Sequence, residues 1–188
     1  MIDLTYAFQR VIGALERGGA RYLVVGSTAA AAWGVIRSTR DIDLVAVIPQ
    51  NSAESFLREL SDENLYFPVD DARKATSTSG SFNILHPASG GKVDVFICPP
   101  DDPFELMRLE RRVQAEILGL TVWVATPEDV ILSKLKWRLA SRSDTQWRDC
   151  VEIAATQPLE IAYMRTWSEH LGVTEDLKDL LFQVGKAS

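Results

Sequence analysis

The sequence predicts a fold of mixed α and β class, because the spacing of apolar residues alternates along the chain between the helical and the strand period. Apolar positions at helical spacing run over residues 3–17 and end at two glycines, and the apolar strand Tyr22–Val25 follows. With 188 residues, 46% of them hydrophobic, the chain is long enough to bury one core. We expect a core domain over residues 1–125 and a helical segment over 126–188 packed on it.

A short helix is predicted between the first two strands. Gly26-Ser27 interrupts the first strand, and the alanine-rich stretch that starts at Thr28 predicts a helix whose small side chains allow close contact with a sheet. The second strand is predicted over Ile42–Ile48 and a further helix over residues 53–60. The chain therefore begins in the order helix, strand, helix, strand.

The second half of the chain contains fewer strands and more helix. Residues 62–80 are polar and predict a mobile loop. Thr126-Pro-Glu-Asp129 is a strong helix start, with a capping hydroxyl, proline at the first helical position and an acid three residues on. The remaining expected elements are strands over 82–86 and 92–98, a helix over 102–112, a strand over 121–125 and helical structure from 127 to 182.

Charge and composition exclude several classes of protein. The formal net charge of −6 does not favour non-specific binding to nucleic acid. The N-terminus lacks the continuous apolar run of a secretion signal, and no segment approaches the length of a membrane span. Cys98 and Cys150 are predicted to be buried in a reducing compartment. We therefore expect a cytoplasmic protein that does not bind a membrane.

Three aspartates lie in or beside predicted core strands. Asp41 and Asp43 are two positions apart at the start of an apolar strand, so their carboxylates point to the same face with α-carbons about 6.6 Å apart. Asp94 lies inside the later strand. Unpaired buried carboxylates cost several kcal/mol each unless they are neutralised or bind a metal. Because hard oxygen ligands suit Mg²⁺, we expect Mg²⁺ (or Mn²⁺) at this position.

These residues together resemble the signature of the nucleotidyltransferase fold, also called the polymerase beta-like fold. The signature has a glycine followed by Gly or Ser, a spacer, and two acids separated by an apolar residue. Here Gly26-Ser27, a spacer of 13 residues and Asp41-Ile-Asp43 match it, and Asp94 matches the third acid. The resemblance implies an α+β fold with a small mixed sheet flanked by helices and a C-terminal helical segment.

The likeness extends to the AbiEii-like group of minimal nucleotidyltransferases, which are associated with toxin–antitoxin systems. It covers about residues 20–155, and the segments with this likeness are Gly34–Asp43, Ser81–His86, Thr126–Lys136 and Gln146–Asp149. The resemblance implies a bacterial or archaeal enzyme that transfers a nucleoside monophosphate from an NTP to a hydroxyl. The acceptor stays open between an RNA end, a protein and a small molecule, and an antitoxin protein is an expected partner.

The chemistry of the transfer agrees with these residues. Transfer of this kind needs positioning and charge neutralisation more than covalent catalysis. Asp41, Asp43 and Asp94 are therefore the expected catalytic residues and metal ligands, with Asp94 also placed to accept the proton of the acceptor hydroxyl. The expected nucleotide-binding residues are Gly26 and Ser27, whose backbone N–H groups lie at a helix start, and Arg37 and Lys134.

Two alternatives remain open at this stage. Lys134 and Lys136 also fit a solvated helix face beside an apolar stripe, although the resemblance assigns Lys134 to the triphosphate. The whole protein could be a catalytically silent nucleotide-binding or regulatory protein of the same fold. Three retained acids favour the enzyme.

Overall fold

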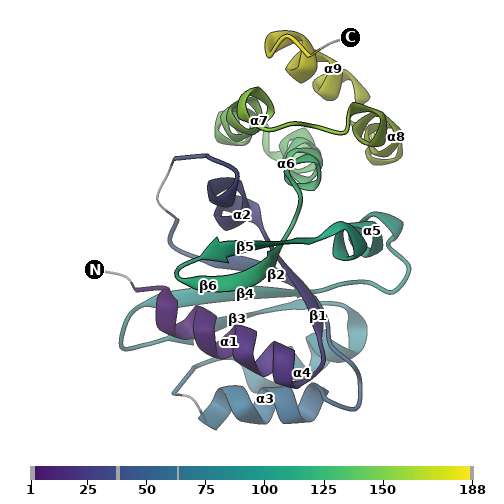
Figure 1. Ribbon diagram of the computed structural model, residues 1–188. Helices are drawn as coiled ribbons and strands as arrows, with labels where there is room; N and C mark the ends of the chain where they lie inside the picture. The colour runs from purple at the N-terminus through teal and green to yellow at the C-terminus, as the bar shows by residue number, and fades with distance from the viewer. Residues whose placement is uncertain (1–2, 37–38, 63, 187–188) are drawn as a thin grey trace.

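The structure is a computed structural model that describes residues 3–36, 39–62 and 64–186, and a six-stranded mixed sheet forms its centre (Figure 1). The strand order is β3-β4-β2-β1-β6-β5. The pairs β2/β4 and β1/β6 are parallel, and the other neighbours are antiparallel. The strands are β1 Arg21–Val25, β2 Ile42–Val47, β3 Ser81–His86, β4 Gly91–Ile97, β5 Val113–Ile117 and β6 Leu120–Val124.

Helices cover both faces of the sheet and continue beyond it. In Figure 1, α1, α3 and α4 lie on one side, α2 and α5 lie on the other, and α6 to α9 stack above α2 and α5. The expected α+β class with a mixed sheet is confirmed. The helices are α1 Thr5–Arg17, α2 Gly26–Ala32, α3 Ala53–Asp62, α4 Val69–Thr78, α5 Pro103–Arg111, α6 Pro127–Ser141, α7 Asp144–Thr156, α8 Ile161–Leu171 and α9 Thr174–Gln183.

The β1-α2-β2 unit has the predicted order, and its turn residue is Gly26. This glycine has φ +64°, in the left-handed region that favours glycine, so β1 can pass directly into α2. Ala29 and Ala30 are fully buried, which lets α2 lie close to the sheet. The chain then returns as β2, antiparallel to β1, with Val25 opposite Asp43. Gly26 is therefore held next to the first acid pair.

Two sequence-based expectations about secondary structure are wrong. The loop expected over 62–80 contains α4, a helix whose Ala72 and Ala75 are buried while its many polar residues face outward. Its apolar stripe is too narrow to stand out in the sequence. The strand β5 was not expected, because it is an edge strand with mostly polar or exposed side chains that is held by antiparallel pairing with β6.

The C-terminal helices begin where the sequence indicated. Thr126 Oγ1 accepts a hydrogen bond from the backbone N–H of Asp129, and proline occupies the first turn of α6. Buried residues of α6 such as Ile131 and Leu135 belong to the same hydrophobic cluster as the strands. Cys98 and Cys150 are free cysteines, and both are buried, as expected. Among the described residues, no helix is long and apolar enough to cross a membrane.

Candidate active site

Asp43 and Asp94 lie side by side because β2 and β4 are parallel and in register. Asp43 pairs with Asp94, and Ile42 pairs with Val93. Neighbouring strands are about 4.8 Å apart, so the two carboxylates share one face of the sheet at close range. Asp41 precedes β2 and lies two positions before Asp43, which directs it to this face as well. The structure therefore brings together the three predicted acids from two strands that are distant in sequence.

Lys92 lies among these acids and was not predicted as a site residue. Its Nζ is 2.6 Å from Asp94 Oδ2 and 3.8 Å from Asp41 Oδ2. Lys92 precedes Asp94 by two positions on β4, so alternation along the strand places both on one face. That spacing was visible in the sequence, but the importance of the lysine depends on the β2/β4 register.

The charge of Asp43 is unfavourable in this setting. Burial raises the pKa of its carboxyl to about 6, and the neighbouring charges of Asp41 and Asp94 push in the same direction. The cations Lys92 and Lys134 oppose the rise. The site therefore holds more negative charge than its own lysines neutralise, which is the condition in which a further cation binds favourably.

Gly26 makes room for this cluster. A Cβ built on Gly26 overlaps Oδ2 of Asp43, so the carboxylate occupies the space that any side chain at position 26 requires. Ser27 follows at the second position of α2 and is partly buried. The backbone of Asp41 is fixed by Thr39, whose Oγ1 donates to the Asp41 carbonyl oxygen at 2.9 Å. The predicted residue Arg37 lies outside the described residues.

Lys134 is buried rather than solvated. Its side chain is 5% exposed, and Nζ donates to Asp149 Oδ2 at 2.7 Å and to Gln146 Oε1 at 2.9 Å. The solvated-face interpretation is therefore wrong for Lys134, although it holds for the exposed Lys136. Asp149 is the other residue missing from the predicted site. Its position in the Gln146–Asp149 segment was a signal, but its partner on α6 is set by the contact of α6 with α7.

No protein-family model and no curated protein sequence matches the chain. Among solved structures, an antigenic nucleotidyltransferase-like protein from Paracoccidioides brasiliensis is similar, with a TM-score of 0.58 and 18% identity over 94% of this chain and 92% of that one. The chain has the nucleotidyltransferase fold.

Two antibiotic-modifying enzymes share this nucleotidyltransferase fold. The lincosamide antibiotic adenylyltransferase LnuA, with lincomycin bound, has a TM-score of 0.56 and 12% identity over 83% of this chain and 99% of its own. ANT(2")-Ia, in complex with adenylyl-2"-tobramycin, has a TM-score of 0.56 and 11% identity over 89% of this chain and 96% of its own. At these identities the likeness establishes the fold.

The acids of this nucleotidyltransferase fold are suited to a hard divalent cation. Asp94 Oδ1 is buried without a hydrogen-bond partner in the described part of the chain, so one carboxylate oxygen is available as a ligand. Carboxylate oxygens are the protein ligands that Mg²⁺ prefers. Within the described ranges, no three acidic, His or Cys side chains already surround one metal position, and the Lys92 ammonium lies against two of the three acids.

A hollow on the sheet is lined in part by residues that follow the acids along β2 and β4. Val45 pairs with Phe96, two positions along the strands from Asp43 and Asp94, and Phe96 is 43% exposed. The hollow has a volume of about 420 Å³, in the range of small-molecule sites. It is lined by Val45, Ser79, Gly80, Ser81, Phe96, Ile97, Cys98, Pro99, Asp102 and Glu105.

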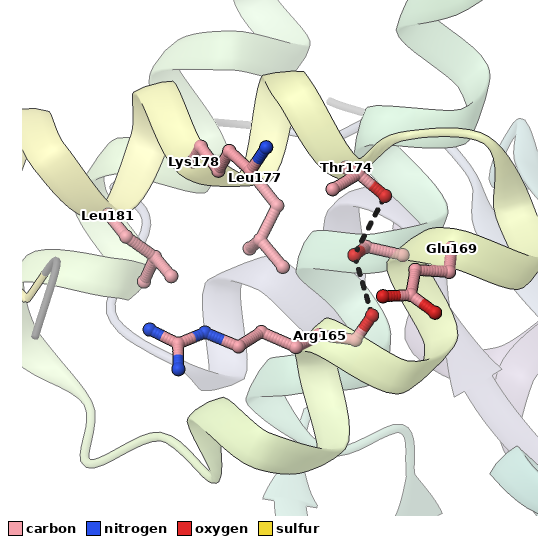
Figure 2. A pocket seen from close by; sticks show the side chains of 7 residues that line it. Arg165, Glu169, Thr174, Leu177, Lys178 and Leu181 are labelled. Carbon is pink, nitrogen blue, oxygen red and sulfur yellow. Dashed lines mark hydrogen bonds between the residues drawn. The ribbon is translucent and has the colours of Figure 1, made fainter.

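A second cavity lies between α8 and α9, on the helices farthest from the sheet (Figures 1 and 2). Figure 2 shows Arg165 extended beneath Leu177 and Leu181, and Ser168 Oγ donates to the Arg165 carbonyl oxygen at 2.8 Å. Its lining contributes one carboxylate in the described chain, that of Glu169. The three predicted acids lie instead in and beside β2 and β4.

Proposed function

We propose that this protein is a metal-dependent nucleotidyltransferase, which moves a nucleoside monophosphate from an NTP to a hydroxyl group and releases pyrophosphate. The observation that supports the proposal most is the pairing of Asp43 with Asp94 on adjacent parallel strands, with Asp41 on the same face. Gly26 approaches Asp43 so closely that any side chain at position 26 would displace this acid. The nucleotidyltransferase fold agrees with this activity.

The three acids have distinct roles in the proposal. Asp41, Asp43 and Asp94 hold Mg²⁺ (or Mn²⁺), and the bound metal neutralises charge on the entering and leaving oxygens. Asp94 also accepts the proton of the acceptor hydroxyl, since its Oδ1 has no hydrogen-bond partner among the described residues. Residues of this chain therefore orient the acceptor hydroxyl and raise its nucleophilicity.

The nucleotide lies on the α2 side of the acids. Backbone N–H groups of Gly26 and Ser27, the Ser27 hydroxyl, and the cations Arg37 and Lys134 bind the triphosphate. Lys134 lies close enough to Asp43 to oppose the rise of the Asp43 pKa, which supports a place for Lys134 near the triphosphate. Its buried contact with Asp149 fixes the ammonium in position.

A small molecule is the acceptor that the structure favours. The hollow lined by Val45 and Phe96, which lie two positions along their strands from Asp43 and Asp94, has a volume suited to a small ligand. Both antibiotic adenylyltransferases of the same fold support this acceptor class. The AbiEii-like resemblance supports a second class, in which a cytoplasmic toxin modifies an RNA end or a protein and is restrained by an antitoxin protein.

The test is label transfer from each α-³²P NTP, with Mg²⁺ or Mn²⁺ and cell extract separated into small-molecule, RNA and protein fractions. We expect label in the small-molecule fraction, and none with Asp43→Asn. Asp71→Asn, which removes an exposed acid of α4, is the matched control and should transfer as the wild type does. NTP binding without transfer to any fraction would establish the silent protein instead. Label in RNA or protein would move the assignment to the toxin class.

A further inference from the structure

We propose that Lys92 is an internal competitor of the metal, which occupies the acid cluster until a nucleotide arrives and then moves to the phosphates. The inference rests on the proposed function and assigns a positioning role to a residue outside the expected site. It makes metal binding dependent on nucleotide binding.

The strand register places the Lys92 ammonium beside Asp41 and Asp94. Ile42 pairs with Val93, so Asp41 and Lys92 are the next positions along β2 and β4 on the face of Asp43 and Asp94. Lys92 Nζ lies 2.6 Å from Asp94 Oδ2 and 3.8 Å from Asp41 Oδ2. The side chain of Asp94 is 13% exposed, so its contact with Lys92 is largely shielded from water. The lysine therefore bridges two of the proposed metal ligands.

The Lys92 ammonium and a divalent metal ion compete for the same carboxylate oxygens. Two positive charges about 4 Å apart repel by about 1 kcal/mol in water and by several times more near a protein surface. A divalent ion that binds Asp94 and Asp41 must therefore displace the ammonium from them. Lys92 lowers metal affinity twice, because it neutralises one negative charge and occupies an oxygen that would otherwise serve as a ligand.

The displaced Lys92 ammonium can move to the phosphates of a bound nucleotide. Lys92 has a flexible stem, and its side chain is 32% exposed, so the ammonium can leave without disturbing the core. A triphosphate provides new anionic oxygens within the same site. Because nucleotide then offsets the loss of the carboxylate contacts, nucleotide and metal should bind with positive coupling, and each should raise the affinity for the other by the same factor.

Calorimetric titration of Mn²⁺ into the full chain tests the proposal. We expect Lys92→Met to bind Mn²⁺ alone at least about tenfold more tightly than the wild type, which corresponds to about 1.4 kcal/mol. A non-hydrolysable NTP should increase the Mn²⁺ affinity of the wild type by a larger factor than that of Lys92→Met. Lys74→Met removes the same charge from an exposed position on α4 and should behave as the wild type. Lys92→Arg keeps a cation at the acids and should remain weak.

A second measurement on the wild type does not depend on a variant that folds. Acetylation of lysines, followed by mass spectrometry, should show Lys92 protected in metal-free protein, more reactive when saturating Mn²⁺ displaces it without nucleotide, and protected again when the NTP analogue is added, with Lys74 unchanged. The proposal is overturned if Lys92→Met binds Mn²⁺ no more tightly than Lys74→Met, or if Lys92 reactivity does not respond to ligands. In those cases tight binding of metal with nucleotide would leave the proposed function intact. No metal binding in any protein, with or without nucleotide, would overturn both.

Discussion

The environment of Asp43 disfavours the ionised form of its carboxyl group. Its pKa is raised to about 6, first by burial and then by Asp41 and Asp94. Between the ordinary value near 3.8 and 6, the folded protein binds this proton more tightly than the unfolded chain. The free energy of unfolding of the metal-free protein should therefore fall as the pH rises through this window.

The variant Asp43→Asn should lose this pH dependence, because the amide does not ionise. Near pH 4 the variant and the wild type should be similarly stable, and above pH 6 the metal-free variant should be the more stable protein. Urea unfolding in EDTA between pH 4 and 7 measures the difference, with Asp71→Asn as the control for removing a carboxylate from an exposed position. A wild type that is more stable than Asp43→Asn above pH 6 would show that Asp43 has a structural role.

Replacing Gly26 with a residue that has a side chain should destabilise the protein for two separate reasons. Gly26→Ala requires a left-handed backbone, at about 1–2 kcal/mol, and also pushes Asp43 out of place. Gly119→Ala is the matched control, because Gly119 has φ +77° but no atom within 4 Å of an added Cβ. We expect Gly26→Ala to lose clearly more free energy of unfolding than Gly119→Ala and to lose Mn²⁺ binding. Equal losses in the two variants would mean that Asp43 adapts to the methyl group.

The α6/α7 pair shows how elements fix a charged side chain. Lys134 on α6 and Asp149 on α7 form an ion pair with side chains 5% and 4% exposed, and Gln146 provides a further acceptor. Both sequence-based interpretations of Lys134, a solvated helix face and a triphosphate contact, predict little effect of its replacement on folding. The structure changes this expectation, because removing the ammonium takes away an ion pair that the buried Asp149 carboxylate makes at 2.7 Å.

Lys134→Met should therefore destabilise the fold by roughly 3–5 kcal/mol. The double variant Lys134→Met with Asp149→Leu should regain most of this loss, because it removes both buried charges. Lys136→Met, on the exposed side of the same helix, should change the free energy of unfolding little. Chemical denaturation of the four proteins measures these differences. If Lys134→Met is no less stable than Lys136→Met, the pair contributes nothing to folding, and its role lies in ligand binding alone.

At the scale of the whole molecule, one hydrophobic cluster joins the sheet to the C-terminal helices. It includes strand residues such as Leu44 and Val95 and helical residues such as Leu135, Ile153 and Leu181. The helix α6 contacts α2 as well as α7, α8 and α9. The division into a core over 1–125 and a segment over 126–188 remains a prediction, and the shared cluster indicates that neither part is stable by itself.

The chain should therefore unfold in one cooperative step. Far-UV circular dichroism reports on all helices, and tryptophan fluorescence reports on Trp33 and Trp123 near the sheet and on Trp147 and Trp167 in the helical segment. The transitions measured by the two methods in urea should coincide. Two separated transitions would show that residues 126–188 are an independent folding unit.

Much of the fold could be predicted from local patterns. The strand before Gly26-Ser27, the small alanine-rich helix, the strand that follows Asp41 and the capped start of α6 all depend on neighbours in sequence. The helix α4 and the edge strand β5 were missed because their stability comes from tertiary contacts. Few side chains of α4 are apolar, and the polar β5 is held by its pairing with β6.

The sequence by itself determined the identity of the acids and their chemistry, since Asp41, Asp43 and Asp94 interrupt apolar strands and the glycine precedes them at a characteristic spacing. Only the tertiary structure decided their arrangement. The parallel β2/β4 register placed Asp94 beside Asp43 and brought Lys92 between Asp94 and Asp41. The contact of α6 with α7 buried Lys134 against Asp149. Residue type and local spacing follow from the chain, whereas strand register and helix contact arise from burying one common core, so the positions of the counter-charges could not be read from the sequence.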